Sequence, residues 1–337
     1  MKTRTVYILS YSLLLALFLT VPIWAGSYVL EILIIALWLG FLGSCWNIIG
    51  GYGGQLSIGH GTFVGIGAYT SSLLFNLYGI TPWLGSFAGA ILSAAVGLGI
   101  GFLCFRFKVR GIYFALITMA IAEIAKLWFE HMELVGSTGG LFLKSVHGPS
   151  GPAFFQFETK WPYYLIILGM LVAVLLICFL LERSKMGYYL KAVRGDEDAA
   201  RCLGVSAFRC KCIAMCISSF LIAFGGTFYA QYRMYIKPDL LMGIHFSVEL
   251  VIPTVIGGWG TVLGPVLGAL LLIPLAEFSR MLTDIIRNTF HTTGLKGFQL
   301  IIYGLILIVV IRFMPLGIVG LWSGLRRKKA SVKYAKD

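Results

Sequence analysis

Long apolar stretches alternate with short polar intervals along most of this chain. A helix needs about 20 predominantly apolar residues to cross a lipid bilayer. The pattern predicts an all-α, polytopic helical membrane protein with about ten transmembrane or half-spanning helices and one domain over residues 1–337. The expected segments are 6–24, 28–49, 58–79, 82–105, 111–129, 161–181, 211–231, 246–257, 262–279 and 298–314.

Two glycine-rich intervals, 50–61 and 256–265, interrupt the apolar pattern. Glycine frees the backbone and proline removes a hydrogen-bond donor, so both intervals are predicted to break helix. At membrane depth, non-helical backbone is tolerated only where it is buried in protein or lines a wet cavity. Paired breaks of this kind point to the translocation path of a transporter. The path candidates are Gly53, Gly54, Gln55, Ser57, His60, Gly257, Gly258, Trp259 and Gly260.

The glycines also have a simpler explanation, because small residues allow two membrane helices to pack closely. We expect each explanation to hold for some of them. The ionisable residues within apolar segments are few. Glu123, Lys126 and Glu130 are spaced so that they share one helix face and neutralise one another, whereas Glu249 is expected at the outer interface. Each could contact a polar solute, but a structural role is the favoured expectation for any single one.

Composition agrees with a membrane protein, since 58% of the residues are hydrophobic and 12% are charged. The net charge is +13, and no nucleic-acid-binding motif accompanies it. The positions of the basic residues along the chain say more than their total. With a cytoplasmic N-terminus, most basic residues fall inside, in 1–5, 106–110, 182–211 and the tail after 314. The positive-inside rule therefore predicts two cytoplasmic termini and an extracytoplasmic loop over about 130–160.

The interval 182–211 is the longest charged stretch between two apolar segments. Its alternation of apolar and charged positions permits one or two short amphipathic helices. Such an element can lie on the membrane surface and offer a face to a soluble partner, although a simple solvated loop is the alternative.

The sequence lacks the short motifs that mark several common enzyme activities. The chain contains no G-x-x-x-x-G-K-[ST], H-E-x-x-H or G-x-S-x-G sequence, so neither an ATPase site of the phosphate-loop type nor an enzyme is expected. The seven cysteines fall in predicted spans or on the cytoplasmic side, which predicts no disulfides, and no metal site is expected. A pore with a docking element and no motor suggests one subunit of a larger machine.

Four stretches closely resemble the M-type permease subunits of branched-chain amino acid ABC importers, in order along the chain. They are 51–69 (GYGGQLSIGHGTFVGIGAY), 190–204 (LKAVRGDEDAARCLG), 238–268 and 313–320 (FMPLGIVG). The resemblance implies a transmembrane permease domain in the bacterial cytoplasmic (inner) membrane that imports leucine, isoleucine or valine. It also implies a sister permease, two cytoplasmic ATP-binding subunits and an extracytoplasmic solute-binding protein as partners. ATP and Mg²⁺ would bind to the ATP-binding subunits, so no cofactor is expected on this chain.

The segment 198–204 is similar to the E-A-A-x-x-x-G docking motif of ABC importers, with Asp in place of Glu and without an evident I-x-L-P continuation. The resemblance implies ATPase docking by Asp198, Ala199, Ala200 and Gly204, with 182–211 as the coupling segment. The chain departs from the family after Gly136-Ser-Thr-Gly-Gly-Leu141, in the outer loop. Two alternatives stay open: the same machinery importing urea or short amides, and an ATP-independent facilitator or channel.

Overall fold

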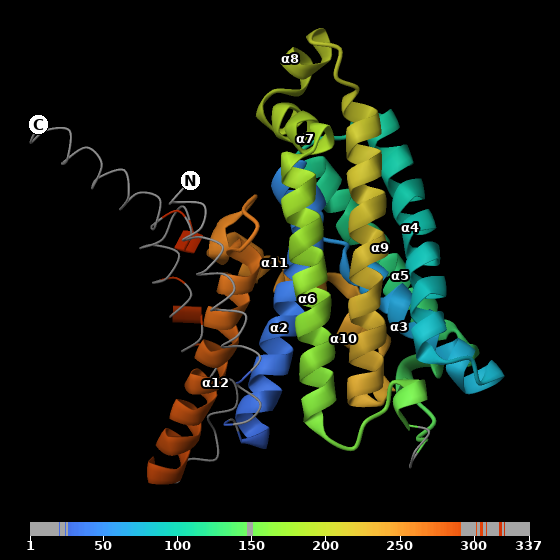
Figure 1. Ribbon diagram of the computed structural model, residues 1–337, viewed down its shortest axis with the longest axis vertical. Coiled ribbons are helices and arrows are strands. Elements are labelled where there is room, and N and C mark those ends of the chain that lie inside the picture. The colour runs from blue at the N-terminus through green and yellow to red at the C-terminus, as the bar shows by residue number, and fades with distance from the viewer. Residues whose placement is uncertain are drawn as a thin grey trace, which may run out of the picture.

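The computed structural model of the protein describes residues 26–146 and 151–290, with side chains up to residue 285, and a few single positions outside these ranges. The expected segments 6–24 and 298–314 lie almost entirely outside the described residues. Figure 1 shows a bundle of long helices, with two short helices, α7 and α8, beyond one end.

Seven helical stretches of the described chain are long and apolar enough to cross a membrane. This confirms the all-α, polytopic membrane architecture, while the total of about ten helices stays a prediction. The stretches are α2 (Ser27–Asn47) with its π-helical continuation η1 (Ile48–Tyr52), α4 (Pro82–Arg106), α5 (Ile112–His131), α6 (Lys160–Arg183), α9 (Ala207–Arg233), α10 with α11 (Pro238–Leu241 and Gly243–Gly258), and α12 (Gly264–Phe290).

Helix α2 is the centre of the bundle. It is apolar on all sides, which is typical of a fully buried helix, and every residue from Ala36 to Asn47 is buried. Its neighbours are α6, α9, α11 and α12. The π-helical turn η1 continues α2 up to Tyr52, and the chain then runs without helix until Gly61, where α3 (Gly61–Tyr78) begins. The first predicted break, residues 50–61, therefore lies mostly buried inside the protein.

Helices α3, α4 and α9 pack at close range through small residues. A Cβ atom at Gly67 would lie 2.2 Å from the carbonyl oxygen of Ala223, and one at Gly226 would lie 1.9 Å from that of Val64. Because real Cβ atoms do not approach so closely, these backbones can touch only where glycine stands. For these glycines the packing explanation holds.

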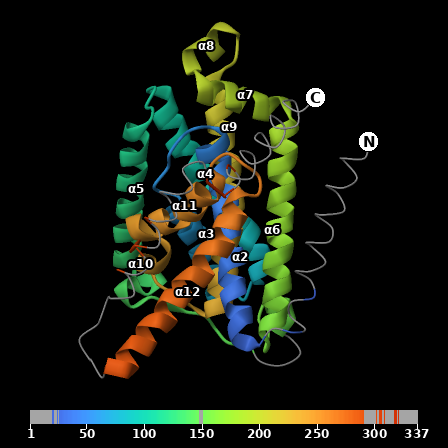
Figure 2. The same ribbon diagram turned by 90° about the vertical axis from the view of Figure 1, so that its left-hand side faces the viewer.

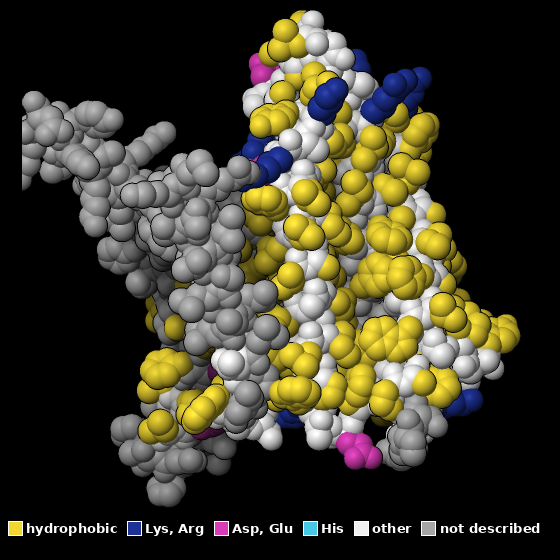
Figure 3. Space-filling model, viewed as in Figure 1, with side chains coloured by type: hydrophobic (Ala, Val, Ile, Leu, Met, Phe, Trp, Pro, Cys, Tyr) yellow, Lys and Arg dark blue, Asp and Glu magenta, His cyan; other side chains and the backbone are white. Residues whose placement is uncertain are grey.

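The two ends of the bundle differ in structure and charge. Helices α7 (Lys185–Gly195) and α8 (Glu197–Cys202) lie at one end, and Figure 3 shows Lys and Arg side chains gathered there above a largely hydrophobic flank. The opposite end carries a small antiparallel pair of strands, β1 and β2. The minor elements are η2 (Glu133–Val135), η3 (Ser137–Gly139), β1 (Leu141–Phe142), η4 (Gly151–Phe154) and β2 (Tyr235–Ile236).

Candidate functional site

The two glycine breaks lie against each other, although 209 residues separate Gly50 from Trp259. The indole Nε1 of Trp259 donates a 2.6 Å hydrogen bond to the carbonyl oxygen of Gly50. The side-chain amide of Asn47 accepts from the backbone N–H of Gly260 at 2.9 Å and donates to the carbonyl oxygen of Thr261 at 2.9 Å. These bonds pair backbone groups that the helix breaks release. Asn47 and the facing parts of the two breaks thus form one unit of residues 47–57 and 257–264, here called the break junction.

Glycine is required at the break junction because backbone packs directly on backbone. A Cβ at Gly51 would lie 1.8 Å from Oδ1 of Asn47 and 2.9 Å from the backbone nitrogen of Gly260. A Cβ at Gly257 would lie 1.7 Å from the carbonyl oxygen of Gly264, at the start of α12. Residue 258 has φ +132°, a conformation that favours glycine.

One charged side chain, Arg194 in the last turn of α7, contacts both breaks. Its Nη1 donates a 2.6 Å hydrogen bond to the carbonyl oxygen of Gly51, and its guanidinium carbon lies 5.7 Å from the ring centroid of Trp259. The side chain also fills the space beside Gly54 and Gly260, where Cβ atoms would lie 2.7 and 2.3 Å from it. Helix α7 is therefore tied to the break junction.

Sequence reasoning did not single out Arg194. Its partner Gly51 lies 143 residues away, and an arginine at the end of a basic amphipathic segment looks like a solvated charge. The only available signal was its place within the stretch 190–204 that carries the family resemblance.

Three polar path candidates lie inside the protein. His60 is fully buried, with Nδ1 2.8 Å from Oγ of Ser57 and Nε2 2.9 Å from Oγ of Ser218, so both ring nitrogens have partners. The carbonyl oxygen of Ser57 accepts from the indole of Trp46 at 2.8 Å. Gln55 is 7% exposed, and its Oε1 has no hydrogen-bond partner among the described residues. A role for these residues in translocation stays a prediction.

The predicted docking residues lie on α8 and just after it. The side chain of Asp198 is 72% exposed and Ala199 is exposed, whereas Ala200 is buried against α7 and the start of α9. Gly204 has φ +82°, the left-handed conformation with which glycine commonly ends a helix. Three of the four residues, Gly204 among them, are thus exposed and Ala200 is buried, while docking itself stays a prediction.

Ion pairs hold α8 to the membrane-spanning helices. Arg110, between α4 and α5, donates to both carboxylate oxygens of Asp198 at 3.2 and 3.3 Å, which holds the pKa of Asp198 below its usual range. Glu197 accepts from Nζ of Lys211 at 2.6 Å and from Arg201 at 2.6 Å. Lys211 belongs to α9 and its side chain is 3% exposed. The last residues of the interval 182–211, from 207 onward, are therefore part of a membrane-spanning helix.

We expect Asp196→Ala to loosen α8. Oδ1 of Asp196 accepts from the backbone N–H groups of Asp198 and Ala199 at 2.9 and 3.0 Å, as an N-cap does. Losing an N-cap costs about 1 kcal/mol, so hydrogen–deuterium exchange should quicken about fivefold over residues 197–202. Asp196→Asn keeps an acceptor oxygen and serves as the control. Unchanged exchange in Asp196→Ala would contradict the assignment.

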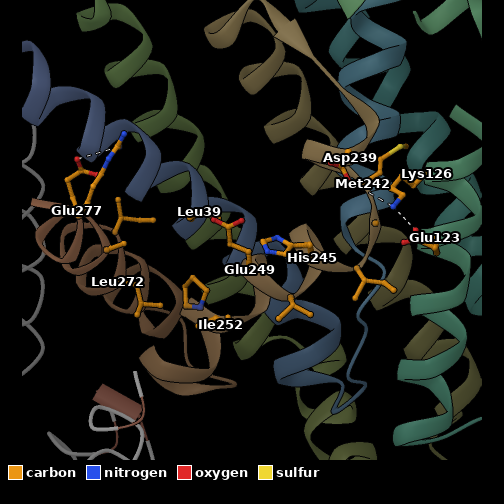
Figure 4. A pocket seen from close by; sticks show the side chains of 17 residues that line it. Leu39, Glu123, Lys126, Asp239, Met242, His245, Glu249, Ile252, Leu272 and Glu277 are labelled. Atoms are coloured by element: carbon orange, nitrogen blue, oxygen red, sulfur yellow. Dashed lines mark ion pairs between the residues drawn. The ribbon is translucent and has the colours of Figure 1, made fainter. Parts of the chain in front are cut away.

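A cavity of about 950 Å³ is lined by α5, α10, α11 and α12 with one residue of α2. Figure 4 shows apolar side chains such as Leu39, Ile252 and Leu272 around it. None of the path candidates lines this cavity. Its charged or titratable residues, all within the described chain, are Glu123, Lys126, Asp239, His245, Glu249, Glu277 and Arg280.

Comparison with known proteins identifies the family. Residues 28–311 match the family described as "Branched-chain amino acid transport system / permease component". The "High-affinity branched-chain amino acid transport system permease protein LivM" of Salmonella typhimurium is 31% identical over 260 residues, which cover 71% of this chain and 60% of the relative. Its Escherichia coli counterpart is 30% identical over the same shares. No solved structure matches.

A more distant relative is named for a different amino acid. A "Tyrosine transport system permease protein" from Clostridioides difficile is 25% identical over 199 residues, covering 57% of this chain and 61% of the relative. This chain spans about 60% of the length of the two LivM relatives. The family match nevertheless includes both glycine breaks, α7, α8 and the cavity. The chain belongs to the family of permease components of branched-chain amino acid transport systems.

Proposed function

We propose that this chain is the membrane-spanning permease subunit of an ATP-driven ABC importer for leucine, isoleucine and valine in a bacterial inner membrane. The observation that carries the proposal is the contact of Arg194 with Gly51 and Trp259, which joins the basic surface segment to both helix breaks. The chain supplies the translocation path, while ATP and Mg²⁺ bind to partner subunits.

The surface of α7 and α8 supports a docked protein partner. Tyr188, Tyr189 and Leu203 are 64%, 44% and 84% exposed at the basic end of the molecule, beside Asp198 and Ala199. Exposed apolar and aromatic side chains rimmed by charge are typical of protein interfaces. This end is assigned to the cytoplasm by the positive-inside rule. Closure of the docked ATPases would move α7, and Arg194 would pass that movement to the break junction.

The names of the relatives support an amino-acid substrate, and two LivM proteins favour a branched side chain. The tyrosine permease is named for a larger side chain, so the side-chain preference is the part of the proposal that most needs a direct test. Urea and short amides are the competing substrates.

The remaining partners follow from the same proposal. A sister permease would complete the translocation path, and a solute-binding protein would deliver substrate at the end that carries β1 and β2. That end is then extracytoplasmic, and both termini are cytoplasmic.

The proposal is tested by affinity-tagging the chain in its native membrane, purifying it in mild detergent and identifying co-purifying proteins by mass spectrometry. Uptake of radiolabelled leucine and urea into cells with and without the chain is measured in parallel. We expect an ATP-binding protein and a second permease, together with energy-dependent leucine uptake. A chain that purifies alone and passes solute without ATP in liposomes would be a facilitator, contrary to the proposal.

A further inference from the structure

Glu249 on α11 carries a carboxylate within a membrane-spanning stretch and makes no hydrogen bond or salt bridge with any described residue. It lines the 950 Å³ cavity, and Figure 4 shows its carboxyl group beside His245, between the apolar side chains of Leu39 and Ile252. Sequence reasoning expects Glu249 at the outer interface. Figure 2 instead shows α11 at about mid-height of the bundle, between α5 and α12.

The other described acidic residues at the cavity have partners. Lys126 lies 2.5 Å from a carboxylate oxygen of Glu123 and 3.9 Å from one of Asp239. Glu277 accepts a hydrogen bond from the hydroxyl of Tyr28 and lies 3.8 Å from Arg280. Among the described acidic residues at this cavity, Glu249 is thus the one without a hydrogen bond or salt bridge, and its one charged or titratable neighbour in Figure 4 is His245.

An ionised group at membrane depth is costly unless it is paired or reaches water. Such residues are a hint of function, and their usual partner is a charge of opposite sign. Leu39 and Ile252 flank Glu249, and apolar surroundings strengthen an interaction that the carboxylate makes with a cation. The apolar side chains of Leu39 and Ile252 beside one carboxylate suit a small solute with an apolar body and one cationic end.

We propose that Glu249 binds the α-ammonium group of an amino acid in this cavity, with Leu39, Ile252 and Leu272 around the solute's branched side chain. This inference rests on the proposed importer function and narrows its substrate class. The ammonium group of an amino acid can form a salt bridge with the carboxylate of Glu249. Urea and short amides are neutral and cannot. The apolar wall and the free carboxylate together favour the amino acid.

The test measures binding of tritiated leucine to the purified full chain in lipid nanodiscs by scintillation proximity. Two leucine analogues compete: 3-methylbutylamine, which lacks the carboxylate, and 4-methylpentanoate, which lacks the ammonium. We expect saturable leucine binding that the amine displaces and the acid does not. Glu249→Gln, of nearly the same shape, should weaken leucine binding about tenfold to hundredfold, because a hydrogen bond to a charged group is lost.

Two further variants make the result specific. Glu249→Asp keeps the charge and should retain a large part of the affinity. Glu158→Gln removes one carboxylate from an exposed position away from the cavity and should bind leucine as the wild type does. The melting temperature of each variant in nanodiscs separates loss of binding from loss of folding.

Three outcomes would overturn the inference: wild-type chain without saturable leucine binding, Glu249→Gln with wild-type affinity, or equal competition by the acid and the amine. If Glu249 pairs with a basic residue of a sister permease, Glu249→Gln will reduce recovery of that subunit and leave leucine binding unchanged, which also overturns it. Failure of the importer proposal is seen separately, because co-purification of an ATP-binding protein does not depend on Glu249.

Discussion

Replacing Arg194 by alanine should, under the proposed importer function, uncouple ATP hydrolysis from uptake while the protein stays folded and the partner ATPases stay docked. The substitution removes the 2.6 Å bond to the carbonyl oxygen of Gly51 and the contact with the ring of Trp259. A charged donor of this kind contributes about 1.5–3 kcal/mol, so leucine uptake per ATP hydrolysed should fall at least about tenfold. The measurement is uptake and ATPase activity of the reconstituted complex, side by side.

The matched control is Lys185→Ala, which removes an exposed basic residue from the first turn of the same helix. It should leave uptake per ATP within about twofold of wild type, since surface charges contribute little. Arg194→Lys keeps a positive charge with a single donor group and should recover part of the coupling. If Arg194→Ala couples as well as Lys185→Ala, α7 does not act through the break junction.

Gly257→Ala should be the most destabilising of these substitutions. The added Cβ would lie 1.7 Å from the carbonyl oxygen of Gly264, 2.4 Å from its carbonyl carbon and 2.9 Å from the backbone nitrogen of Gly268. All three atoms are backbone, so α11 and α12 must separate to make room. Overpacking of this severity costs about 3 kcal/mol, which lowers the melting temperature by about 6 °C or more. Thermal unfolding followed by intrinsic fluorescence in detergent measures the change.

The control for this effect is the same chemical change at Gly169 in α6. A Cβ at that position meets no atom within 4 Å, so Gly169→Ala should leave the melting temperature unchanged or raise it slightly, because alanine favours helix by about 1 kcal/mol. Equal melting temperatures for the two variants would show that the contact between α11 and α12 is looser than the structure has it.

Features set by neighbouring residues could be predicted from the sequence. The expected segments 28–49, 82–105 and 161–181 lie within a few residues of α2, α4 and α6, because apolar length alone decides whether a helix suits a bilayer. The glycine-rich intervals do break helix, with α3 beginning only at Gly61 and α11 ending at Gly258. The amphipathic segment that becomes α7 and α8 could also be recognised, since its charges and glycines are adjacent in the chain.

Features that depend on contacts between distant parts of the chain could not be predicted from the sequence. The sequence could not show that Ser57 and Ser218 pair with both ring nitrogens of the path candidate His60, whose role in translocation stays a prediction. Apolar periodicity could not show that Arg194 reaches across to Gly51 and Trp259, since those contacts join segments far apart in sequence.

The sequence alone determined that this protein is a helical membrane protein with two breaks, a basic surface segment and a family resemblance, because each of these depends on local composition. The tertiary structure decided that the two breaks are one junction and that Arg194 joins α7 to it. It also decided that Glu249 lines a cavity, where no described residue makes a hydrogen bond or salt bridge with it. Packing brings backbone groups and charged side chains from distant segments into contact, and a local pattern of residues does not predict these long-range contacts.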